Sequence, residues 1–554
     1  VKANSYPNAM PSLVQVDETA YLFWLDDVAS RADNDRTALV YATSRDMVNW
    51  SEPRQIVPET ANSTADYMYD VCVEGGKIHI AMCKANQQFG TGEVGLNEMA
   101  ASADVYYTNL DTDSMVIAPL QCVAGNSYAN LIPKVVAADG QVVVAYAENQ
   151  MENGIFGLGN TYQVVSASIV DGNVGRIVKT EASGLLNALN AGILDGQPAI
   201  SYIVDVDRDY QTDADRELYL LTGGQEVQLT NNDLAETAPK FAAIGGADSL
   251  LWYANGNIFY ISSADGPVNT VFADNNAIGI GNNFYVINDD LGNARIVWTA
   301  LPADENIDTM TVWATDYCNE TWTGVYPLLE TNSLMTSALS GYTVGDRSYI
   351  AYLRTKEISA DSQLTDLCVN MAAPVMDIGL LAVDYDFEAV IPGAALPLKI
   401  TVQNNGGLPV DNIAVDVDGE PLTGISVADL DIGEIKTYEV VGFVVPSDLT
   451  GLQTVTAKVN VAGDVKESNN ANDFKIGYTD ISVTANRVLV NGSDWANIIV
   501  KNESAIPTDV TLTALANNAE GAVLFKRSFS ALAKENAQTV LLPLAELETK
   551  GNVR

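Results

Sequence analysis

The chain has 554 residues, 47% of them hydrophobic, and 71 acidic against 29 basic residues give it a formal net charge of −42 at pH 7. This length exceeds what one hydrophobic core can organise, and the hydrophobic fraction argues against a disordered chain. An acidic surface repels phosphate backbones and anionic lipids, so nucleic acid and anionic membranes are poor partners.

One pattern recurs over the first two thirds of the chain: a short apolar strand, a turn with Gly or Asp, and a second apolar strand. Its copies span residues 11–27, 69–83, 133–148, 190–205, 239–254, 283–300 and 339–354. Units of about 50 residues with four strands each are typical of a β-propeller, whose blades bury one another's faces in a ring. The pattern predicts an all-β propeller over residues 1–373 with seven blades, six being the alternative.

Two finer repeats support blades of common origin. Tyr41-Ala42-Thr43 precedes Trp50 by the same offset that separates Trp313-Ala314-Thr315 from Trp322. The run Asp33-Asn34-Asp35-Arg36 of the first unit also returns as Asp213-Ala214-Asp215-Arg216 in the fourth.

The pattern changes after residue 373. Alternating strands separated by Asn-Gly, Pro and Asp-Gly turns predict an immunoglobulin-like β-sandwich over residues 374–478. Residues 398–415 resemble residues 498–512, with Asn404 aligned on Asn502, which predicts a second such sandwich over residues 479–554. Closing strands are not evident in that second copy, so we expect an incomplete sandwich there.

Two segments resemble known families. Residues 374–478 resemble the CARDB family of bacterial cell-adhesion modules, through the runs Val402-Gln403-Asn404-Asn405-Gly406-Gly407, Leu430-Asp431-Ile432-Gly433 and Lys466-Glu467-Ser468-Asn469-Asn470. The run Ser44-Arg45-Asp46-Met47-Val48-Asn49-Trp50 resembles a shortened Asp-box, the turn of sialidase-like propellers. The first resemblance implies an extracellular spacer, and the second implies that Asp46 ties a turn and Trp50 packs between strands.

These resemblances imply a protein that is secreted or displayed on a bacterial cell surface. The first ten residues lack the charged-then-apolar pattern of a signal peptide, so we expect the sequence to be the mature part of something longer. No apolar stretch approaches about 18 residues, and we expect no membrane insertion by this chain.

The residue just after each blade entry is expected to face the central channel. Ser12, Asp70, Lys134 and Lys240 occupy this place, and the last three are the candidate ligand-binding residues. Asp70 is also a weak candidate for a catalytic acid, although glycosidases use two opposed carboxylates. No nucleophile elbow, phosphate-binding loop or zinc-protease motif is present, so the sequence favours a protein without catalytic residues.

The cysteines and the histidine do not indicate a metal site. The five cysteines lack CxxC spacing, which favours buried thiols over a disulfide framework and leaves one disulfide open. The one histidine, His79, lies in an apolar strand and is expected to pack there.

A calcium site is the one cofactor hypothesis, and no cofactor is required by the remaining sequence. Six acids fall within thirteen residues of the fourth unit, and oxygen-rich loops of this kind wrap Ca²⁺. The candidate ligands are Asp205, Asp207, Asp209, Asp213, Asp215 and Glu217. The alternative is a solvated hairpin in which Arg216 pairs with neighbouring aspartates.

Three functions remain open from the sequence. The first is a non-catalytic adhesion or ligand-binding protein, with the propeller recognising a glycan or a surface protein and the sandwiches acting as a stalk. The second is a secreted glycan-active hydrolase or lyase with acidic catalytic residues in the channel. The third is a self-assembling unit of an envelope layer or an extracellular filament.

Overall fold

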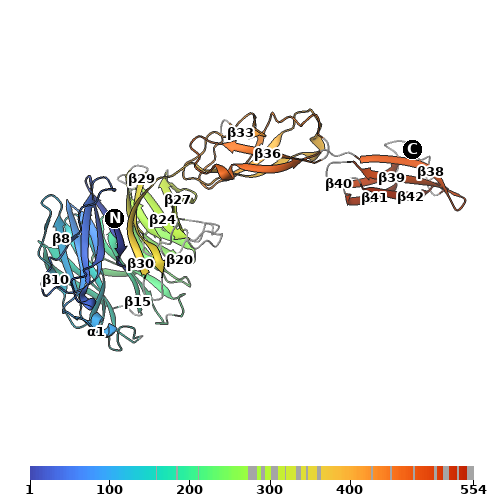
Figure 1. Cartoon of the computed structure of the whole chain (residues 1–554). Helices are drawn as coiled ribbons and strands as arrows, with labels where there is room; N and C mark the ends of the chain where they lie inside the picture. The colour runs from blue at the N-terminus through green and yellow to red at the C-terminus, as the bar shows by residue number, and fades with distance from the viewer. Residues whose placement is uncertain are drawn as a thin grey trace. The chain divides into compact units, whose positions relative to one another are not determined.

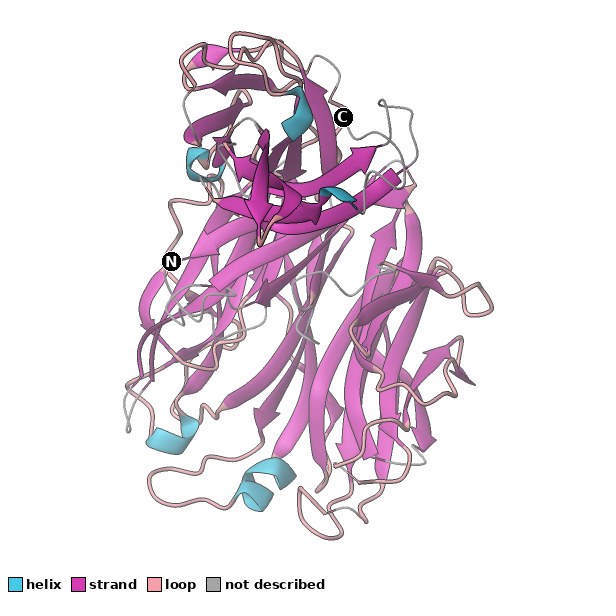
Figure 2. Ribbon diagram, turned by 90° about the vertical axis from the view of Figure 1, so that its right-hand side faces the viewer, coloured by secondary structure: helices cyan, strands magenta, loops and turns pink. Residues whose placement is uncertain are grey.

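Strands dominate the computed structural model, as Figure 2 shows. It describes residues 1–157, 159–181, 185–209, 211–271, 284–288, 293–300, 310–318, 320–331, 339–344, 347–358, 363–425, 428–449, 452–477, 481–503, 508–515, 523–532 and 536–545. The chain forms two compact units, Val1–Pro374 and Val375–Arg554. The helical segments whose bounds lie within the described residues are short: η1 (Asp33–Asp35), α1 (Leu96–Ala101), η2 (Phe387–Ala389) and η3 (Glu467–Asn469). In the described part of the chain, no helix is both long and apolar enough to cross a membrane.

The described residues of the first unit form seven antiparallel sheets that follow one another along the chain. Figure 1 shows the strands of this unit coloured along the chain. Blade one contains β2 (Ser12–Val16), β3 (Thr19–Asp27), β4 (Thr37–Ser44) and β5 (Arg54–Gln55). Blade two contains β6 (Asp66–Glu74), β7 (Lys77–Ala85), β8 (Ala103–Asp111), β9 (Val116–Ile117) and β10 (Gln121–Ala124). Blade three contains β11 (Ala129–Ala138), β12 (Gln141–Asn149), β13 (Tyr162–Val170) and β14 (Asn173–Glu181).

The other four sheets repeat this order. Blade four contains β15 (Leu185–Leu194), β16 (Gln197–Asp205), β17 (Arg216–Thr222) and β18 (Gln225–Gln228), and blade five contains β19 (Thr237–Ile244), β20 (Ala247–Ala254), β21 (Asn257–Ile261) and β22 (Asn269–Thr270). Blade six contains β23 (Tyr285–Asn288), β24 (Ala294–Ala300), β25 (Met310–Cys318), β26 (Thr321–Trp322) and β27 (Tyr326–Thr331). Blade seven contains β28 (Ser340–Val344), β29 (Arg347–Ile358), β30 (Gln363–Ala372) and β1 (Lys2–Ser5).

The innermost strands close a ring. Each inner strand contacts the next in the order β2, β6, β11, β15, β19, β23, β28. The last of them, β28, contacts β2. The predicted seven-bladed propeller is therefore confirmed, and six blades are ruled out. Each predicted paired-strand unit corresponds to the inner two strands of one blade.

The first strand of the chain completes the last blade, which the sequence pattern did not indicate. β1 pairs antiparallel with β30, and the Ser5 hydroxyl donates to the Thr365 carbonyl at 3.2 Å across 360 residues of chain. This pairing covers what would otherwise be an open sheet edge and joins the two ends of the propeller sequence.

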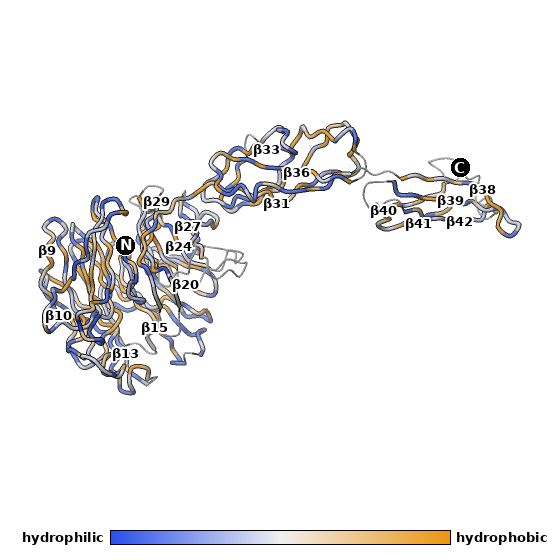
Figure 3. The backbone as a smooth tube through the Cα atoms, viewed as in Figure 1, coloured by the Kyte–Doolittle hydropathy of each residue, from blue (hydrophilic) through white to orange (hydrophobic). Residues whose placement is uncertain are grey.

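Hydrophobic clusters fill the interfaces between neighbouring blades. On β3, Phe23 faces the cluster shared with blade two, whereas the adjacent Trp24 faces the cluster shared with blade seven. Alternate residues of one strand thus serve two interfaces, because successive side chains point to opposite faces of a sheet. Hydrophobic colour in Figure 3 accordingly runs along the strands of the blades.

The second unit begins with two packed sheets. One contains β31 (Ile378–Tyr385), β32 (Leu398–Asn404) and β35 (Ile435–Val440), and the other contains β33 (Ala414–Val417), β34 (Glu420–Pro421), β36 (Gln453–Asn460) and β37 (Ala471–Ile476). Leu398, Ile400 and Val402 alternate along β32 and are fully buried in the core between the sheets. This is the predicted immunoglobulin-like sandwich.

The chain ends in a smaller pair of sheets. One contains β38 (Ile481–Val490), β39 (Ser493–Asn502) and β42 (Ala537–Pro543), and the other contains β40 (Thr508–Leu515) and β41 (Val523–Leu532). Ile498 and Val540 pack against Leu512 and Phe525 of the facing sheet. Asn502 lies at the end of β39 as Asn404 lies at the end of β32, and each is fully buried. Each amide donates to a distant carbonyl, Asn404 to Leu430 and Asn502 to Leu532.

The five cysteines, all within the described residues, form no disulfide with one another. Only part of the expectation of buried thiols is met, since Cys83 is buried whereas Cys122 and Cys318 are exposed. Cys122 lies on β10, the outer strand of its blade, where a small residue need not be covered. His79 packs in β7, with its Nδ1 2.7 Å from the Tyr107 hydroxyl, and burial lowers its pKa.

Candidate functional site

The propeller channel contains a cavity of about 470 Å³ lined by the inner strands of five blades. Asp70 on β6, Lys134 on β11 and Lys240 on β19 all line it, together with Asn190 on β15 and Tyr285 on β23. The cavity extends along these strands from the level of Asp70 toward the turns that lead to the second strand of each blade. The three residues singled out in the sequence thus share one cavity.

Strand register explains why they meet. Asp70 pairs with Ala81, Lys134 with Ala145 and Lys240 with Leu251, and each lies four residues before the last paired residue of its inner strand. Asn190 and Ser340 occupy the same place in blades four and seven. Neither residue was predicted to face the channel, although the same four-residue offset marks both.

Asp70 acts as a link between blades. Its Oδ1 lies 3.3 Å from the Lys134 ammonium, and its Oδ2 accepts a hydrogen bond from the Val135 backbone N–H at 3.0 Å. Both carboxylate oxygens are therefore engaged by blade three. This arrangement suits a structural carboxylate better than an acid that must give up a proton.

Asn190 and Ser340 make comparable links. The Asn190 amide donates to the Pro239 carbonyl of blade five at 2.8 Å, and the Ser340 hydroxyl accepts from the Leu13 N–H of blade one at 2.8 Å. One ring position of the propeller thus holds neighbouring inner strands together through polar side chains.

Lys240 differs from the others at this position. Its ammonium group has no hydrogen-bond or ion-pair partner among the described residues, and it borders the open cavity. Burial lowers the pKa of Lys240 to about 8, with a smaller lowering from Lys134 and an opposing effect of Asp70. The group therefore remains mostly protonated at neutral pH and gives the cavity a cation without a protein counter-ion.

The acidic loop lies between β16 and β17 in blade four. Carboxylate oxygens of Asp205, Asp207 and Asp215 lie within 4.8 Å of one another. Burial raises the pKa of Asp205, Arg216 opposes this, and the neighbouring carboxylates of Asp215 and Asp207 raise it further.

The other three acids of the predicted calcium set are engaged elsewhere. Asp209 Oδ1 accepts from the Gln211 N–H at 3.1 Å, and Glu217 Oε1 accepts from the Asn232 N–H at 3.0 Å. Asp213 is exposed and lies 3.9 Å from the Arg216 guanidinium. The structure thus brings together three of the six.

A buried carboxylate pair near this loop was not singled out in the sequence. Glu217 and Glu236 are 5% and 0% exposed, and Asn232 bridges them by donating its N–H to one and its amide to the other. Burial raises the pKa of Glu236 to about 7, the Asn232 amide lowers it, and Glu217 raises it. Nothing in the local sequence marks this pair, because Glu217 lies on β17 and Glu236 lies in the segment that leads into β19.

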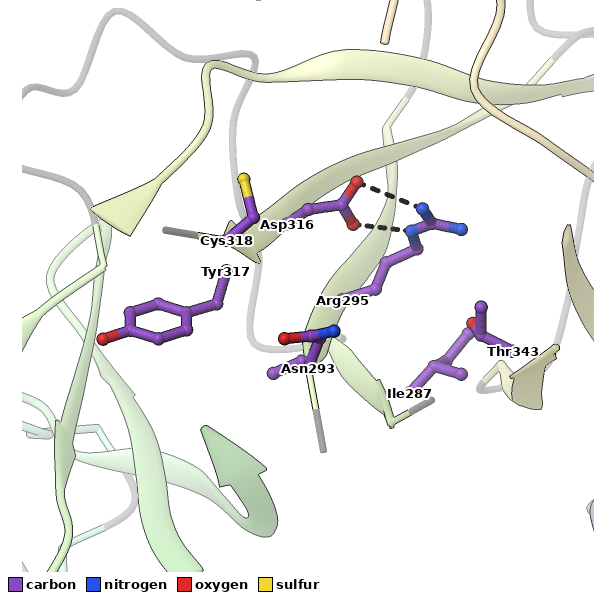
Figure 4. A pocket seen from close by; sticks show the side chains of 8 residues that line it. Ile287, Asn293, Arg295, Asp316, Tyr317, Cys318 and Thr343 are labelled. Atoms are coloured by element: carbon purple, nitrogen blue, oxygen red, sulfur yellow. Dashed lines mark hydrogen bonds and ion pairs between the residues drawn. The ribbon is translucent and has the colours of Figure 1, made fainter. Parts of the chain in front are cut away.

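A smaller pocket of about 160 Å³ is lined by residues of blade six and by Thr343 of blade seven (Figure 4). Arg295 dominates it, and its guanidinium binds both oxygens of Asp316, at 2.6 and 3.1 Å. A third nitrogen donates to the Ser348 hydroxyl at 2.6 Å. Because Arg295 is bound on all three nitrogens, it is a link between β24, β25 and β29 rather than a ligand-binding cation.

The shortened Asp-box forms a tied turn. Asp46 accepts hydrogen bonds from the backbone N–H groups of Val48 and Asn49, at 3.0 and 2.7 Å. Trp50 packs on the cluster between blades one and seven. These are the roles that the resemblance implied, and both lie away from the cavity-lining residues.

Residues 376–476 match the CARDB family. This segment is a CARDB domain. It comprises the two packed sheets from β31 to β37. No curated protein matches the chain.

Among solved structures, the chain is similar to an alpha-L-arabinanase of Penicillium chrysogenum complexed with arabinobiose, with 14% identity, a TM-score of 0.37, and coverage of 54% of this chain and 93% of that one. It is also similar to Trypanosoma rangeli sialidase in complex with the inhibitor DANA, with 10% identity, a TM-score of 0.36, and coverage of 86% and 89%. The propeller is established by the strand pairing of the chain itself.

Proposed function

We propose that this is a non-catalytic ligand-binding protein that works outside a bacterial cell. In this proposal the propeller channel recognises an anionic saccharide, and the CARDB domain and the sandwich after it act as a stalk. The proposal rests on the ammonium group of Lys240, which borders the cavity and has no protein partner among the described residues.

Charge and size support an anionic ligand. The cavity of about 470 Å³ falls within the range of small-molecule sites, which run from about 300 to 1,000 Å³. Lys134 is paired with Asp70, and Asp248, the other carboxylate of the lining, accepts a hydrogen bond from the Gly196 N–H. The Lys240 ammonium therefore has no ion-pair partner among the described residues. A carboxylate or sulfate group on a sugar supplies the missing counter-ion, and Asn190 and Tyr285 offer further polar atoms.

Binding without hydrolysis fits the carboxylates of the cavity. Its lining contains two, Asp70 and Asp248. Asp70 is held by Lys134 and Val135, and Asp248 accepts a hydrogen bond from the Gly196 N–H at the turn between β15 and β16. Glycoside hydrolysis needs an acid able to donate a proton and a second carboxylate opposed to it, and neither of these two residues is placed as such an acid.

The test is calorimetric titration of the full chain with matched neutral and acidic oligosaccharides, such as galactan and polygalacturonate fragments. We expect binding of the acidic series alone, at least tenfold weaker in Lys240→Gln. The control Lys77→Gln changes an exposed lysine of blade two and is expected to leave the affinity unchanged.

Three outcomes contradict the proposal. Equal binding of neutral and acidic sugars removes the role of charge, and no binding of either removes the ligand class. Release of sugar products that is abolished by Asp70→Asn supports the hydrolase alternative instead. Labelling of intact bacterial cells with an antibody against the propeller tests the location separately.

A further inference from the structure

The loop between β16 and β17 presents three carboxylates to a common point. Asp205 ends β16, Asp207 follows two residues later, and Asp215 immediately precedes β17. One carboxylate oxygen from each lies within 4.8 Å of the other two. Oxygens at such separations can share one cation, and without one they repel.

The loop backbone holds two of these carboxylates in place. Asp215 Oδ2 accepts a hydrogen bond from the Asp207 N–H at 2.6 Å. Asp207 Oδ1 accepts from the Asp209 N–H at 2.7 Å, and its Oδ2 accepts from the Thr212 hydroxyl at 2.9 Å. Each carboxylate is therefore oriented by the same short loop that carries it.

The third carboxylate, that of Asp205, has a buried oxygen without a hydrogen-bond partner. Asp205 is fully buried, its Oδ1 has no hydrogen-bond partner, and the buried Oδ1 of Asp215 has none either. Arg216 contacts only the other oxygen of Asp205, with Nε 3.4 Å from Oδ2. Buried carboxylate oxygens without a donor are costly, and a metal ion is one of the few groups that satisfies them.

Blade one provides a comparison within the same molecule, because it carries the same Asp-x-Asp-Arg repeat. There Asp35 accepts from the N–H groups of Phe89 and Gly90, at 3.0 and 2.8 Å. Asp27 is paired with Arg36 at 2.6 Å, and Asp26 with Lys2. No oxygen of these three aspartates is both buried and without a hydrogen-bond partner, whereas Asp205 Oδ1 and Asp215 Oδ1 in blade four are.

We propose that Asp205, Asp207 and Asp215 bind one calcium ion at the rim of blade four. Three carboxylates and one contacting guanidinium leave two negative charges, which a divalent cation balances. Calcium accepts irregular sets of carboxylate oxygens completed by water, whereas magnesium requires near-ideal octahedral geometry. The ion joins the ends of β16 and β17 and so orders the rim of the blade. The site is independent of the ligand proposed for the channel.

The experiment is calorimetric titration of the chelator-treated full chain with Ca²⁺, and with Mg²⁺ in parallel. We expect one Ca²⁺ site per chain with a Kd of about 10⁻⁴ to 10⁻³ M, the range of extracellular modules. Asp207→Asn and Asp215→Asn are expected to weaken binding at least tenfold. Asp213→Asn, in the same loop but outside the cluster, and Asp33→Asn, its counterpart in blade one, are expected to bind as the wild type does.

Folding of each variant is checked by circular dichroism, and Asp207→Asn changes an exposed side chain that the core does not need. Absence of Ca²⁺ heat in the wild type overturns the proposal. So does binding that survives Asp207→Asn combined with Asp215→Asn, or magnesium binding as tight as calcium binding. A rise in the propeller melting temperature with Ca²⁺ that is lost in Asp207→Asn, but kept in Asp213→Asn, supports it.

Discussion

Replacing Glu236 with glutamine is expected to stabilise the propeller at pH 8 and to leave its stability unchanged at pH 4.5. Glu236 is fully buried just before β19, its Oε1 accepts from the Asn232 amide at 2.8 Å, and its Oε2 has no partner. Glutamine has the same shape, keeps the acceptor for Asn232 and carries no charge at any pH.

The magnitude follows from the pKa of this carboxyl. Burial raises the pKa of Glu236 to about 7 from an ordinary value of 4.5. Below pH 4.5 the group is protonated in both states and contributes nothing to pH dependence. Between pH 4.5 and 7 the unfolded chain loses the proton while the folded chain keeps it, so stability falls as pH rises. At about 1.36 kcal/mol per pKa unit, the folded propeller is about 3 kcal/mol less stable above pH 7 because of this group.

Urea unfolding of wild type and Glu236→Gln at pH 4.5, 6 and 8 measures the difference. Six of the seven tryptophans lie in the propeller, so intrinsic fluorescence reports mainly on that unit. Comparing two chains at each pH cancels the titration of other groups, including Asp66, whose pKa burial raises to about 6. Glu93→Gln, at an exposed position, serves as the control.

We expect the variant to gain on the wild type progressively from pH 4.5 to pH 8, by about 3 kcal/mol at the top of this range. A difference that does not change with pH refutes the reasoning, because a raised pKa must produce a pH-dependent gap. A variant that loses stability with rising pH relative to wild type refutes it as well, since this is the opposite sign.

Three other variants test the packing of the two units. Gly192→Ala places a methyl carbon 2.1 Å from the Phe241 Cβ of the next blade. We expect this variant to lose about 1–3 kcal/mol of propeller stability in urea unfolding. The control Gly95→Ala, whose added methyl group meets no atom within 4 Å, is expected to show no change. Asn404→Ala removes the buried amide that donates to the Leu408 and Leu430 carbonyls. We expect the CARDB domain to lose about 1–3 kcal/mol of stability, measured by hydrogen exchange of β32 and β36. Unchanged exchange would contradict this prediction. In the Asp-box turn, backbone and side-chain hydrogen bonds from Asn49, with the Val48 N–H, hold the pKa of Asp46 well below its usual range. Asp46→Ala should therefore lower the melting temperature of the propeller at pH 7, and the gap should narrow as pH falls below 3.8; a gap independent of pH would exclude the ionised turn.

Much of the fold could be predicted because the pattern of a strand is local. On β12, Val142, Val144 and Tyr146 face one cluster, and this alternation is readable in the sequence without any partner. The turns between paired strands are equally local, since Gly140 and Gly196 adopt the positive φ angles that their hairpins require. The aligned residues Asn404 and Asn502 likewise marked one sandwich as a repeat of the other.

The candidate sites were only partly readable. Constant offsets within each hairpin place Asp70, Lys134 and Lys240 at one level of the channel, because register fixes where an inner-strand side chain lies. The same rule could not show that Asp70 is held by Lys134 while Lys240 has no partner among the described residues. That depends on how neighbouring blades are spaced around the ring.

Sequence alone determined the hairpins and their order, since these follow from alternation and turn chemistry within about twenty residues, and it left seven or six blades open. Only the tertiary structure decided that β1 completes blade seven, that Asn232 bridges Glu217 and Glu236, and that three of six loop carboxylates converge. These contacts join residues from separate blades or from opposite sides of a turn. Their partners are set by the closure of the ring and by side-chain direction, and no local pattern encodes either.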